Sequence, residues 1–172
     1  MKNIFLLTGE PKVGKTTALK KIITLIGKEH CGGFLTEEVR DGTERIGFKV
    51  RTIEGGESII ADIKTKSSLC VGRYGVDLEA FEHIGIESIY DALKNKKYVI
   101  IDEIGPMQLY SEPFKHALLA VAESTKIVIG TIVFRPYEWA DDFKLRKNVN
   151  TIKVTFDTRD HIPFEIYKML KV

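Results

Sequence analysis

The sequence predicts an α/β fold of three layers, with helices on both faces of a mostly parallel sheet that carries an inserted antiparallel β-meander. Short continuous apolar runs recur at Ile4–Leu7, Tyr98–Ile101 and Lys126–Thr131, as in strands buried on both faces. Segments with a helical spacing of apolar residues alternate with these runs. Between residues 36 and 63 the pattern changes to short runs separated by turn sequences, which a crossover helix would not show.

The chain opens with the strongest of these patterns. A strand is expected at Ile4–Leu7, followed at once by a glycine-containing loop. From Lys15 onward the apolar residues between Ala18 and Ile26 follow helical spacing, and Gly27 is placed to end the helix. The expected order is therefore strand, loop and helix.

The inserted meander follows a strand expected at Cys31–Thr36. Turn sequences at positions 41–42 and 54–56 contain glycine, which suits tight reversals between antiparallel strands. The expected antiparallel runs are Glu37–Arg40, Arg45–Ile53 and Ser58–Ile63.

The rest of the chain returns to alternating helix and strand. The expected helices are Leu78–Lys96, Ser111–Ser124 with Ser111 as its N-cap, Pro136–Leu145 and Asp160–Leu170, and the expected strands are Tyr98–Ile101, Lys126–Thr131 and Thr151–Thr155. Because no repeat, low-complexity tract or linker interrupts the pattern, we expect one domain over residues 1–172.

Composition is that of an ordinary globular protein. The 172 residues are 44% hydrophobic and 29% charged, and the formal net charge of +2 gives no strong nucleic-acid signal. Cys31 and Cys70 have no CxxC spacing and are expected as free thiols. A signal-peptide cleavage pattern is lacking, and no apolar run approaches the roughly 20 residues of a membrane span. We therefore expect a cytoplasmic monomer that makes no membrane contact.

A phosphate-binding loop is the clearest motif. The segment Gly9–Thr16 (GEPKVGKT) matches the pattern G-x-x-x-x-G-K-[ST] at every position, between a buried strand and an amphipathic helix. The glycines allow backbone N–H groups to converge, and the helix N-terminus adds its positive end, which together suit a polyphosphate. We expect Lys15 on the β and γ phosphates and the Thr16 hydroxyl on Mg²⁺.

Two adjacent carboxylates end the strand at Tyr98–Ile101. Asp102 is expected to hold Mg²⁺ together with Thr16, and Glu103 to activate the water that attacks the γ-phosphorus. An apolar strand ending in two acids is also common as a simple turn, but the phosphate loop upstream favours the catalytic interpretation. The expected nucleotide-binding residues are Gly9, Glu10, Pro11, Lys12, Val13, Gly14, Lys15, Thr16, Thr17, Asp102 and Glu103.

These motifs and several further blocks resemble the cancer-related nucleoside-triphosphatase family, small P-loop enzymes first described from thermophiles. The blocks are Thr8–Thr17, Gly33–Arg40 with Arg45–Phe48, Val71–Phe81, Val99–Met107 and Val154–Pro163. The resemblance implies a RecA-like core, Mg²⁺-dependent hydrolysis of nucleoside triphosphates with loose base preference, and a catalytic Glu103.

Two positions depart from the family pattern. Lys12 stands in the loop where the family usually has glycine, which adds a side chain and a charge beside the phosphates. Val133 stands where histidine commonly follows Thr-Ile in the family, so any role of that histidine is absent or replaced here.

Hydrolysis also calls for a cation on the developing γ-phosphate charge besides Lys15 and Mg²⁺. We take Arg73 as the catalytic candidate, although it could equally form a surface pair with Asp77 or Glu79. Arg135 is a second candidate. Arg159 is expected to pair with Asp157 or Asp160 in a structural role.

Other residues carry weaker functional interpretations. Asp77 precedes a helix and is expected as its N-cap rather than as a catalytic group. Glu37 and Glu38 are expected as exposed carboxylates rather than Mg²⁺ ligands. Aromatic residues at positions 134, 137 and 139 are expected to pack under a short helix, although they could stack on a base.

Three functions are compatible with these residues. The first is a nucleoside-triphosphatase, which the pair Asp102–Glu103 and the family resemblance favour. The second is a P-loop kinase that transfers the γ-phosphoryl group to a nucleoside, nucleotide or nucleic-acid hydroxyl. The third is a nucleotide-gated binding module that presents the meander to a partner.

Overall fold

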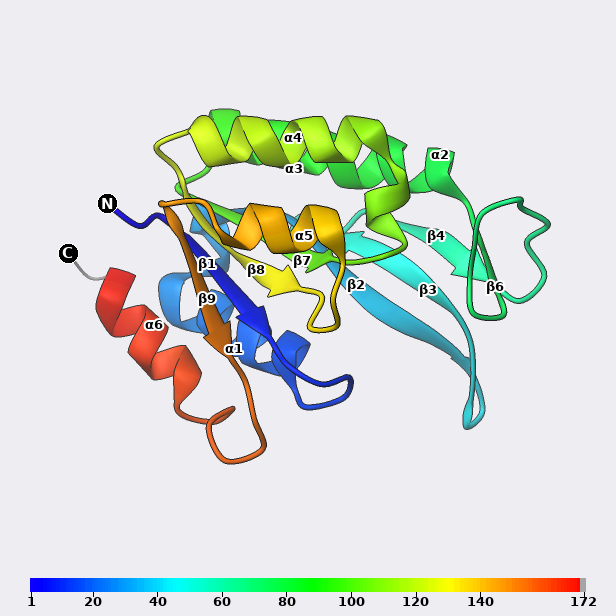
Figure 1. The fold of residues 1–172 in the computed structure, drawn as a ribbon, viewed down its shortest axis with the longest axis horizontal. Coiled ribbons are helices and arrows are strands. Elements are labelled where there is room, and N and C mark those ends of the chain that lie inside the picture. The colour runs from blue at the N-terminus through cyan, green and yellow to red at the C-terminus, as the bar shows by residue number, and fades with distance from the viewer. Residues whose placement is uncertain (171–172) are drawn as a thin grey trace.

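The computed structural model describes residues 1–170 and confirms an α/β fold with helices on both faces of one sheet (Figure 1). The strands are β1 (Ile4–Thr8), β2 (Cys31–Asp41), β3 (Glu44–Thr52), β4 (Glu57–Asp62), β5 (Cys70–Val71), β6 (Tyr74–Val76), β7 (Tyr98–Ile104), β8 (Ile127–Ile132) and β9 (Val149–Lys153). The helices are α1 (Lys15–Ile26), α2 (Leu78–Phe81), α3 (Glu87–Asn95), α4 (Glu112–Glu123), α5 (Glu138–Lys144) and α6 (Ile162–Leu170), with short turns η1 (Lys28–His30), η2 (Glu82–Ile86) and η3 (Gln108–Tyr110).

Within the described residues, nine strands form one sheet in the order β5-β6-β4-β3-β2-β7-β8-β1-β9. Strands β2, β7, β8, β1 and β9 pair in parallel, whereas β2, β3, β4, β6 and β5 pair antiparallel. The start of β2, Cys31–Phe34, pairs with β7, and the segment Phe34–Asp41 pairs with β3. One long strand therefore joins the parallel half to the meander, where the sequence predicts two shorter runs.

The side-chain alternation of the strands divides the core into two layers. In β1, Ile4 and Leu6 belong to the cluster that packs against α3, α4 and α5, whereas Phe5 and Leu7 belong to the cluster with α1 and α6. Figure 1 shows these two sets of helices on opposite faces of the sheet. None of the helices in residues 1–170 has the length and apolar character that crossing a bilayer requires.

Three local features differ from the sequence expectations. The stretch between Ile63 and Leu78, for which the sequence predicts no helix or strand, contains the hairpin β5–β6, which extends the sheet at its edge. The helix expected at Leu78–Lys96 contains a π turn at Glu82–Ile86, where Gly85 lies against Phe81: an added Cβ would be 2.7 Å from the ring. The last strand ends at Lys153 rather than Thr155, because the chain then turns across the loop after β1.

The parallel half of the sheet determines where a ligand can bind. The carboxyl ends of β1, β7, β8 and β9 lie at the same edge, because these strands are parallel neighbours. Open α/β sheets bind ligands at this edge. The loop after β1, the carboxylates at the end of β7 and the loop after β9 therefore lie together there.

Candidate functional site

The loop between β1 and α1 has the backbone of a phosphate-binding loop. Gly9 and Gly14 have φ angles of 154° and 107°, and Gly14 is the N-cap of α1. A Cβ atom at Gly9 would lie 2.5 Å from the backbone oxygen of Val154, so only glycine fits there. Within residues 1–170 no side chain caps the first turn of α1, whose N–H groups are therefore available to an anion.

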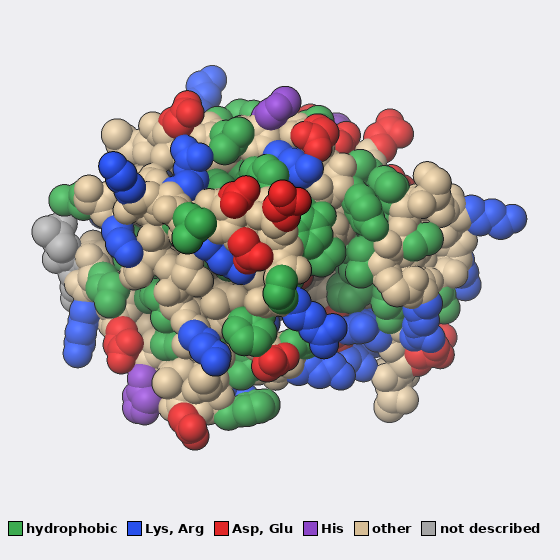
Figure 2. Space-filling model, in the orientation of Figure 1, with side chains coloured by type: hydrophobic (Ala, Val, Ile, Leu, Met, Phe, Trp, Pro, Cys, Tyr) green, Lys and Arg blue, Asp and Glu red, His purple; other side chains and the backbone are tan. Residues whose placement is uncertain are grey.

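The Lys15 side chain folds over this loop. Its Nζ atom donates hydrogen bonds to the backbone oxygens of Gly9, at 2.7 Å, and Glu10, at 2.9 Å. Burial lowers the pKa of Lys15, against the raising effect of three nearby carboxylates. Figure 2 shows further Lys and Arg side chains gathered between the loop and the β2–β3 hairpin, which favours a polyanion at this edge.

Asp102 is held on three sides at the end of β7. Its side chain is only 3% exposed, and Oδ2 accepts a hydrogen bond of 2.9 Å from Thr16 Oγ1. Thr131 Oγ1 donates to Oδ1, and Thr36 Oγ1 donates to the Asp102 backbone oxygen at 2.6 Å. Burial raises the pKa of Asp102, although the hydrogen bonds from Thr131 and Thr16 oppose the shift.

Glu103 is half-buried beside Asp102, yet no residue in positions 1–170 donates a hydrogen bond to its carboxylate. Burial raises the pKa of Glu103 to about 7, helped by the Asp102 carboxylate and opposed by the Lys15 ammonium. A partly desolvated carboxylate without a donor is suited to accept a proton from a bound molecule.

The donor set beside the loop fits Mg²⁺. The hydroxyl of Thr16 and the carboxylate of Asp102 are 2.9 Å apart, and both are the hard oxygen ligands that this ion prefers. Mg²⁺ usually takes one or two protein ligands and completes its shell with phosphate oxygens and water. Thr16 and Asp102 therefore have the chemistry to hold it.

The structure does not bring Arg73 to this cluster, which corrects the catalytic interpretation of that residue. Arg73 lies at the turn between β5 and β6, where it pairs with Glu44 at 3.0 Å and donates to the backbone oxygen of Arg45. In the sheet, β4, β3 and β2 lie between β6 and β7, the strand that carries Asp102 and Glu103. The glycine-flanked block around Arg73 serves the edge hairpin rather than the phosphate loop.

Arg159 was expected to pair with Asp157 or Asp160, and the structure contradicts this expectation as well. Among the residues described, no carboxylate pairs with the Arg159 guanidinium. Instead the side chain lies against the phosphate loop: a Cβ atom at Gly14 would be 3.3 Å from Arg159 Cδ.

The remaining weak candidates have structural partners. Asp77 caps α2 by accepting from Ala80 N at 2.9 Å, as expected. Glu37 pairs with Lys20 at 3.1 Å and Glu38 with Arg45 at 2.9 Å. Tyr137 and Trp139 pack against the core, which confirms the expected packing of these two aromatic residues.

Three polar residues of the site were missed by the sequence interpretation. Thr36 and Thr131 hold Asp102, and Gln108 is 2% exposed with its amide nitrogen 3.5 Å from Thr36 Oγ1. The Gln108 Oε1 atom has no hydrogen-bond partner among the described residues. A signal existed for Thr131, a polar residue at the carboxyl end of an otherwise apolar strand, but nothing in the sequence connects Thr36 or Gln108 to Asp102.

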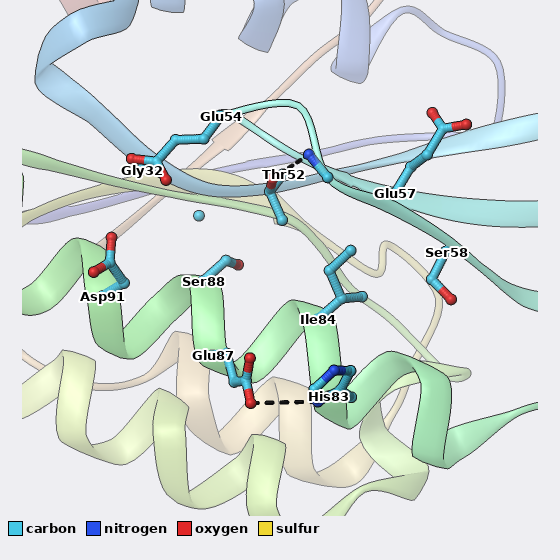
Figure 3. A pocket seen from close by; sticks show the side chains of 12 residues that line it. Gly32, Thr52, Glu54, Glu57, Ser58, His83, Ile84, Glu87, Ser88 and Asp91 are labelled. Atoms are coloured by element: carbon cyan, nitrogen blue, oxygen red, sulfur yellow. Dashed lines mark hydrogen bonds and ion pairs between the residues drawn. The ribbon is translucent and has the colours of Figure 1, made fainter.

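A separate cavity of about 490 Å³ lies between the β3–β4 turn and the helical segment of η2 and α3 (Figure 3). Its walls carry Glu54 and Glu57 on one side and His83, Glu87 and Asp91 on the other. This acidic lining disfavours a polyphosphate. The cavity includes no residue of the phosphate loop, so the loop edge is the better candidate site.

Comparison with known proteins agrees with this geometry. The sequence model of a family described as NTPase matches residues 4–167. The nucleoside-triphosphatase THEP1 of Thermotoga maritima is 39% identical over 166 residues, which cover 96% of this chain and 94% of the relative. A cancer-related nucleoside-triphosphatase homolog of Bos taurus is 35% identical over 175 residues, covering 93% of this chain and 92% of the relative.

Solved structures show the same fold. The crystal structure of THEP1 from the hyperthermophile Aquifex aeolicus aligns with a TM-score of 0.87 at 35% identity and covers 100% of both chains. The solution structure of a human cancer-related nucleoside triphosphatase aligns with a TM-score of 0.83 at 31% identity, covering 99% of this chain and 98% of the human one. The chain therefore belongs to the NTPase family, with which its phosphate loop and paired carboxylates agree.

Proposed function

We propose that this chain hydrolyses nucleoside triphosphates to the diphosphate and phosphate, with Mg²⁺, at the cluster of phosphate loop, Asp102 and Glu103. The observation that carries the proposal is the Glu103 carboxylate, which follows the buried Asp102, faces the charge of Lys15 and has no donor among the described residues. The names of the relatives, which are nucleoside-triphosphatases, support the same reaction.

Each residue of the cluster has a role in this reaction. The N–H groups at the start of α1 would bind the phosphates, and Lys15 would exchange its two backbone acceptors for β and γ phosphate oxygens. Thr16 and Asp102 would hold Mg²⁺, whose charge stabilises the developing charge on the phosphate oxygens.

Glu103 would act as the general base. It would take a proton from water as the water oxygen bonds to the γ-phosphorus, while the bond from that phosphorus to the β–γ bridging oxygen breaks and the diphosphate leaves with the bonding electrons. Because these contacts all go to the triphosphate and to water, we expect ATP, GTP and other nucleoside triphosphates as substrates, with low base selectivity.

A phosphate-release assay without an acceptor tests the proposal. We expect the purified full chain with Mg²⁺ to release phosphate from ATP, GTP, CTP and UTP. We expect Lys15→Ala to weaken binding of Mg²⁺-ATP, whereas Lys28→Ala, beyond the far end of α1, serves as the matched control. Negligible release that only an added hydroxyl acceptor restores would refute hydrolysis and support the kinase alternative.

The expectation of a cytoplasmic monomer stays a prediction. Light scattering of the purified chain would test the monomer directly, since a dimer would double the mass of 19.5 kDa.

A further inference from the structure

The segment after β9, residues 154–159, lies directly on the phosphate loop. The Val154 amide donates a hydrogen bond of 2.7 Å to the backbone oxygen of Thr8. A Cβ atom at Gly9 would lie 2.5 Å from the backbone oxygen of Val154, and one at Gly14 would lie 3.8 Å from a guanidinium nitrogen of Arg159. Both glycines of the loop thus contact this segment, so whatever it exposes borders the proposed nucleotide site.

Two side chains of the segment form an exposed π surface. Phe156 is 68% exposed, and the guanidinium carbon of Arg159 lies 5.2 Å from the centre of its ring. Within the described part of the chain, Arg159 makes no hydrogen bond or ion pair through its side chain. Neither the ring nor the guanidinium is therefore used to hold the fold, and both side chains are exposed beside the phosphate loop.

Hydrogen bonds within the segment also hold its backbone. The Thr155 and Thr158 side chains accept hydrogen bonds from each other's backbone N–H, at 3.3 and 3.0 Å, and the Arg159 N–H donates to the Thr155 backbone oxygen at 3.0 Å. Phe156 and Arg159 therefore extend from a hydrogen-bonded turn, which lowers the entropy lost when a ligand stacks on them.

We propose that Phe156 and Arg159 form the nucleobase-stacking subsite for the triphosphate bound in the loop, an inference that rests on the proposed function. Aromatic rings and guanidinium planes both stack on bases, and every base has a π face. Such a surface binds purines and pyrimidines without reading their hydrogen-bonding edges. The subsite therefore accounts for low base selectivity by stacking alone.

Comparing ligands that have a base with a ligand that has none distinguishes base stacking from a phosphate contact. Dissociation constants are measured for Mg²⁺ complexes of ATP, GTP, CTP and UTP, and of inorganic tripolyphosphate, which has no base. Loss of one stacking partner is expected to weaken binding of all four nucleotides by about tenfold in Phe156→Ala and in Arg159→Ala. Tripolyphosphate binding is expected to change less than about twofold in both variants.

The chain offers a matched control. Phe164 on α6 is 45% exposed and lies under the Lys21 ammonium at 4.8 Å, so it is also an exposed ring with a cation above it. Phe164→Ala is expected to leave all five dissociation constants unchanged. Thermal unfolding of each variant is recorded, and because Phe156 is exposed its variant is expected to keep the wild-type midpoint.

Two outcomes would contradict the assignment of Phe156 and Arg159 to a base-stacking subsite. Equal losses for nucleotides and tripolyphosphate in Arg159→Ala would make that residue a phosphate contact, and unchanged nucleotide binding in Phe156→Ala would remove the stacking surface. The proposed function fails differently. The wild-type chain would then bind nucleotides, and the two variants would lose affinity for nucleotides but not for tripolyphosphate, yet the wild-type chain would release no phosphate.

Discussion

Lys12 occupies an unusual backbone conformation for a residue with a side chain. Its φ angle is 65°, in the left-handed region, and its side chain is exposed. This conformation costs a residue with a Cβ atom about 1 kcal/mol or more relative to glycine. The cost falls within the phosphate loop, whose backbone must curl to direct its N–H groups inward.

Substitutions at position 12 should reveal this cost. We expect the free energy of unfolding of Lys12→Gly to exceed that of Lys12→Ala by about 1 kcal/mol, since alanine keeps the strain and glycine removes it. Urea denaturation of both variants measures the difference. An alanine variant as stable as the glycine variant would show that the left-handed conformation carries no cost here.

Thr131 supports the most buried carboxylate of the site. In Thr131→Val the Asp102 Oδ1 atom loses its donor within the core, so we expect the free energy of unfolding to fall by about 1 to 3 kcal/mol. Thr151→Val, on exposed β9 surface, is the control and is expected to stay within about 0.5 kcal/mol of the wild type. Equal stability of the two variants in urea denaturation would contradict the role of Thr131.

Site residues that are adjacent in the sequence could be predicted from it, whereas residues joined only by the fold could not. The loop at Gly9–Thr16 and the pair Asp102–Glu103 each form a contiguous pattern with its own chemistry. Thr36 reaches Asp102 only because β2 pairs with β7. For the same reason the sequence did not show that Arg159 lies beside the loop and that Arg73 lies at the edge hairpin. No local pattern says which arginine the fold brings to the loop.

At the level of elements, the block Val71–Phe81, which contains Arg73, has a structural role in place of the catalytic role expected from the sequence. The block spans the hairpin β5–β6 and the start of α2, where Asp77 accepts a hydrogen bond from Ala80 N. Such a cap satisfies a free backbone N–H of the first helical turn and contributes about 0.5 to 2 kcal/mol. Position and hydrogen bonding thus favour a structural role for the carboxylate.

Two substitutions separate the cap from catalysis. Asp77→Ala is expected to lower the free energy of unfolding by about 0.5 to 2 kcal/mol, whereas Asp77→Asn, which caps about as well, should stay near the wild type. Both variants should keep wild-type phosphate release at temperatures where they are folded. A large loss of activity in a stable Asp77→Asn variant would instead make this carboxylate a catalytic group.

Strands and helices with a clear period were predicted well, and the errors arose where long-range pairing decides structure. Ser111 caps α4 as expected, because its Oγ atom accepts a hydrogen bond of 3.1 Å from the Phe114 backbone N–H. The hairpin β5–β6 has too few residues to show alternation, and it is a strand pair only because β4 offers an edge. The length of β2 likewise follows from having a partner on each side.

For the whole molecule, the two cysteines report on the integrity of the core. Cys31 is fully buried, and burial raises the pKa of its thiol to about 12, whereas Cys70 is exposed. Because the thiolate is the reactive form, Cys31 stays protonated and unreactive at any pH well below 12 in the folded chain. Its labelling therefore requires unfolding of the surrounding structure.

Alkylation at about pH 8 followed by mass spectrometry should find one label on the native chain and two after denaturation. The variant Cys70→Ser should take up no label when folded. Rapid double labelling of the native wild-type chain would contradict the buried position of Cys31.

Hydrolysis at this site requires a group that activates water, and Glu103→Gln tests directly whether Glu103 is that group. We predict that this variant binds Mg²⁺-ATP within about twofold of the wild type while phosphate release falls by about 10²- to 10⁴-fold. Glu37→Gln, at an acid that pairs with Lys20 and Arg51, is the control and should release phosphate at the wild-type rate. Phosphate release by Glu103→Gln at the wild-type rate would contradict the assignment and move the general base to another group.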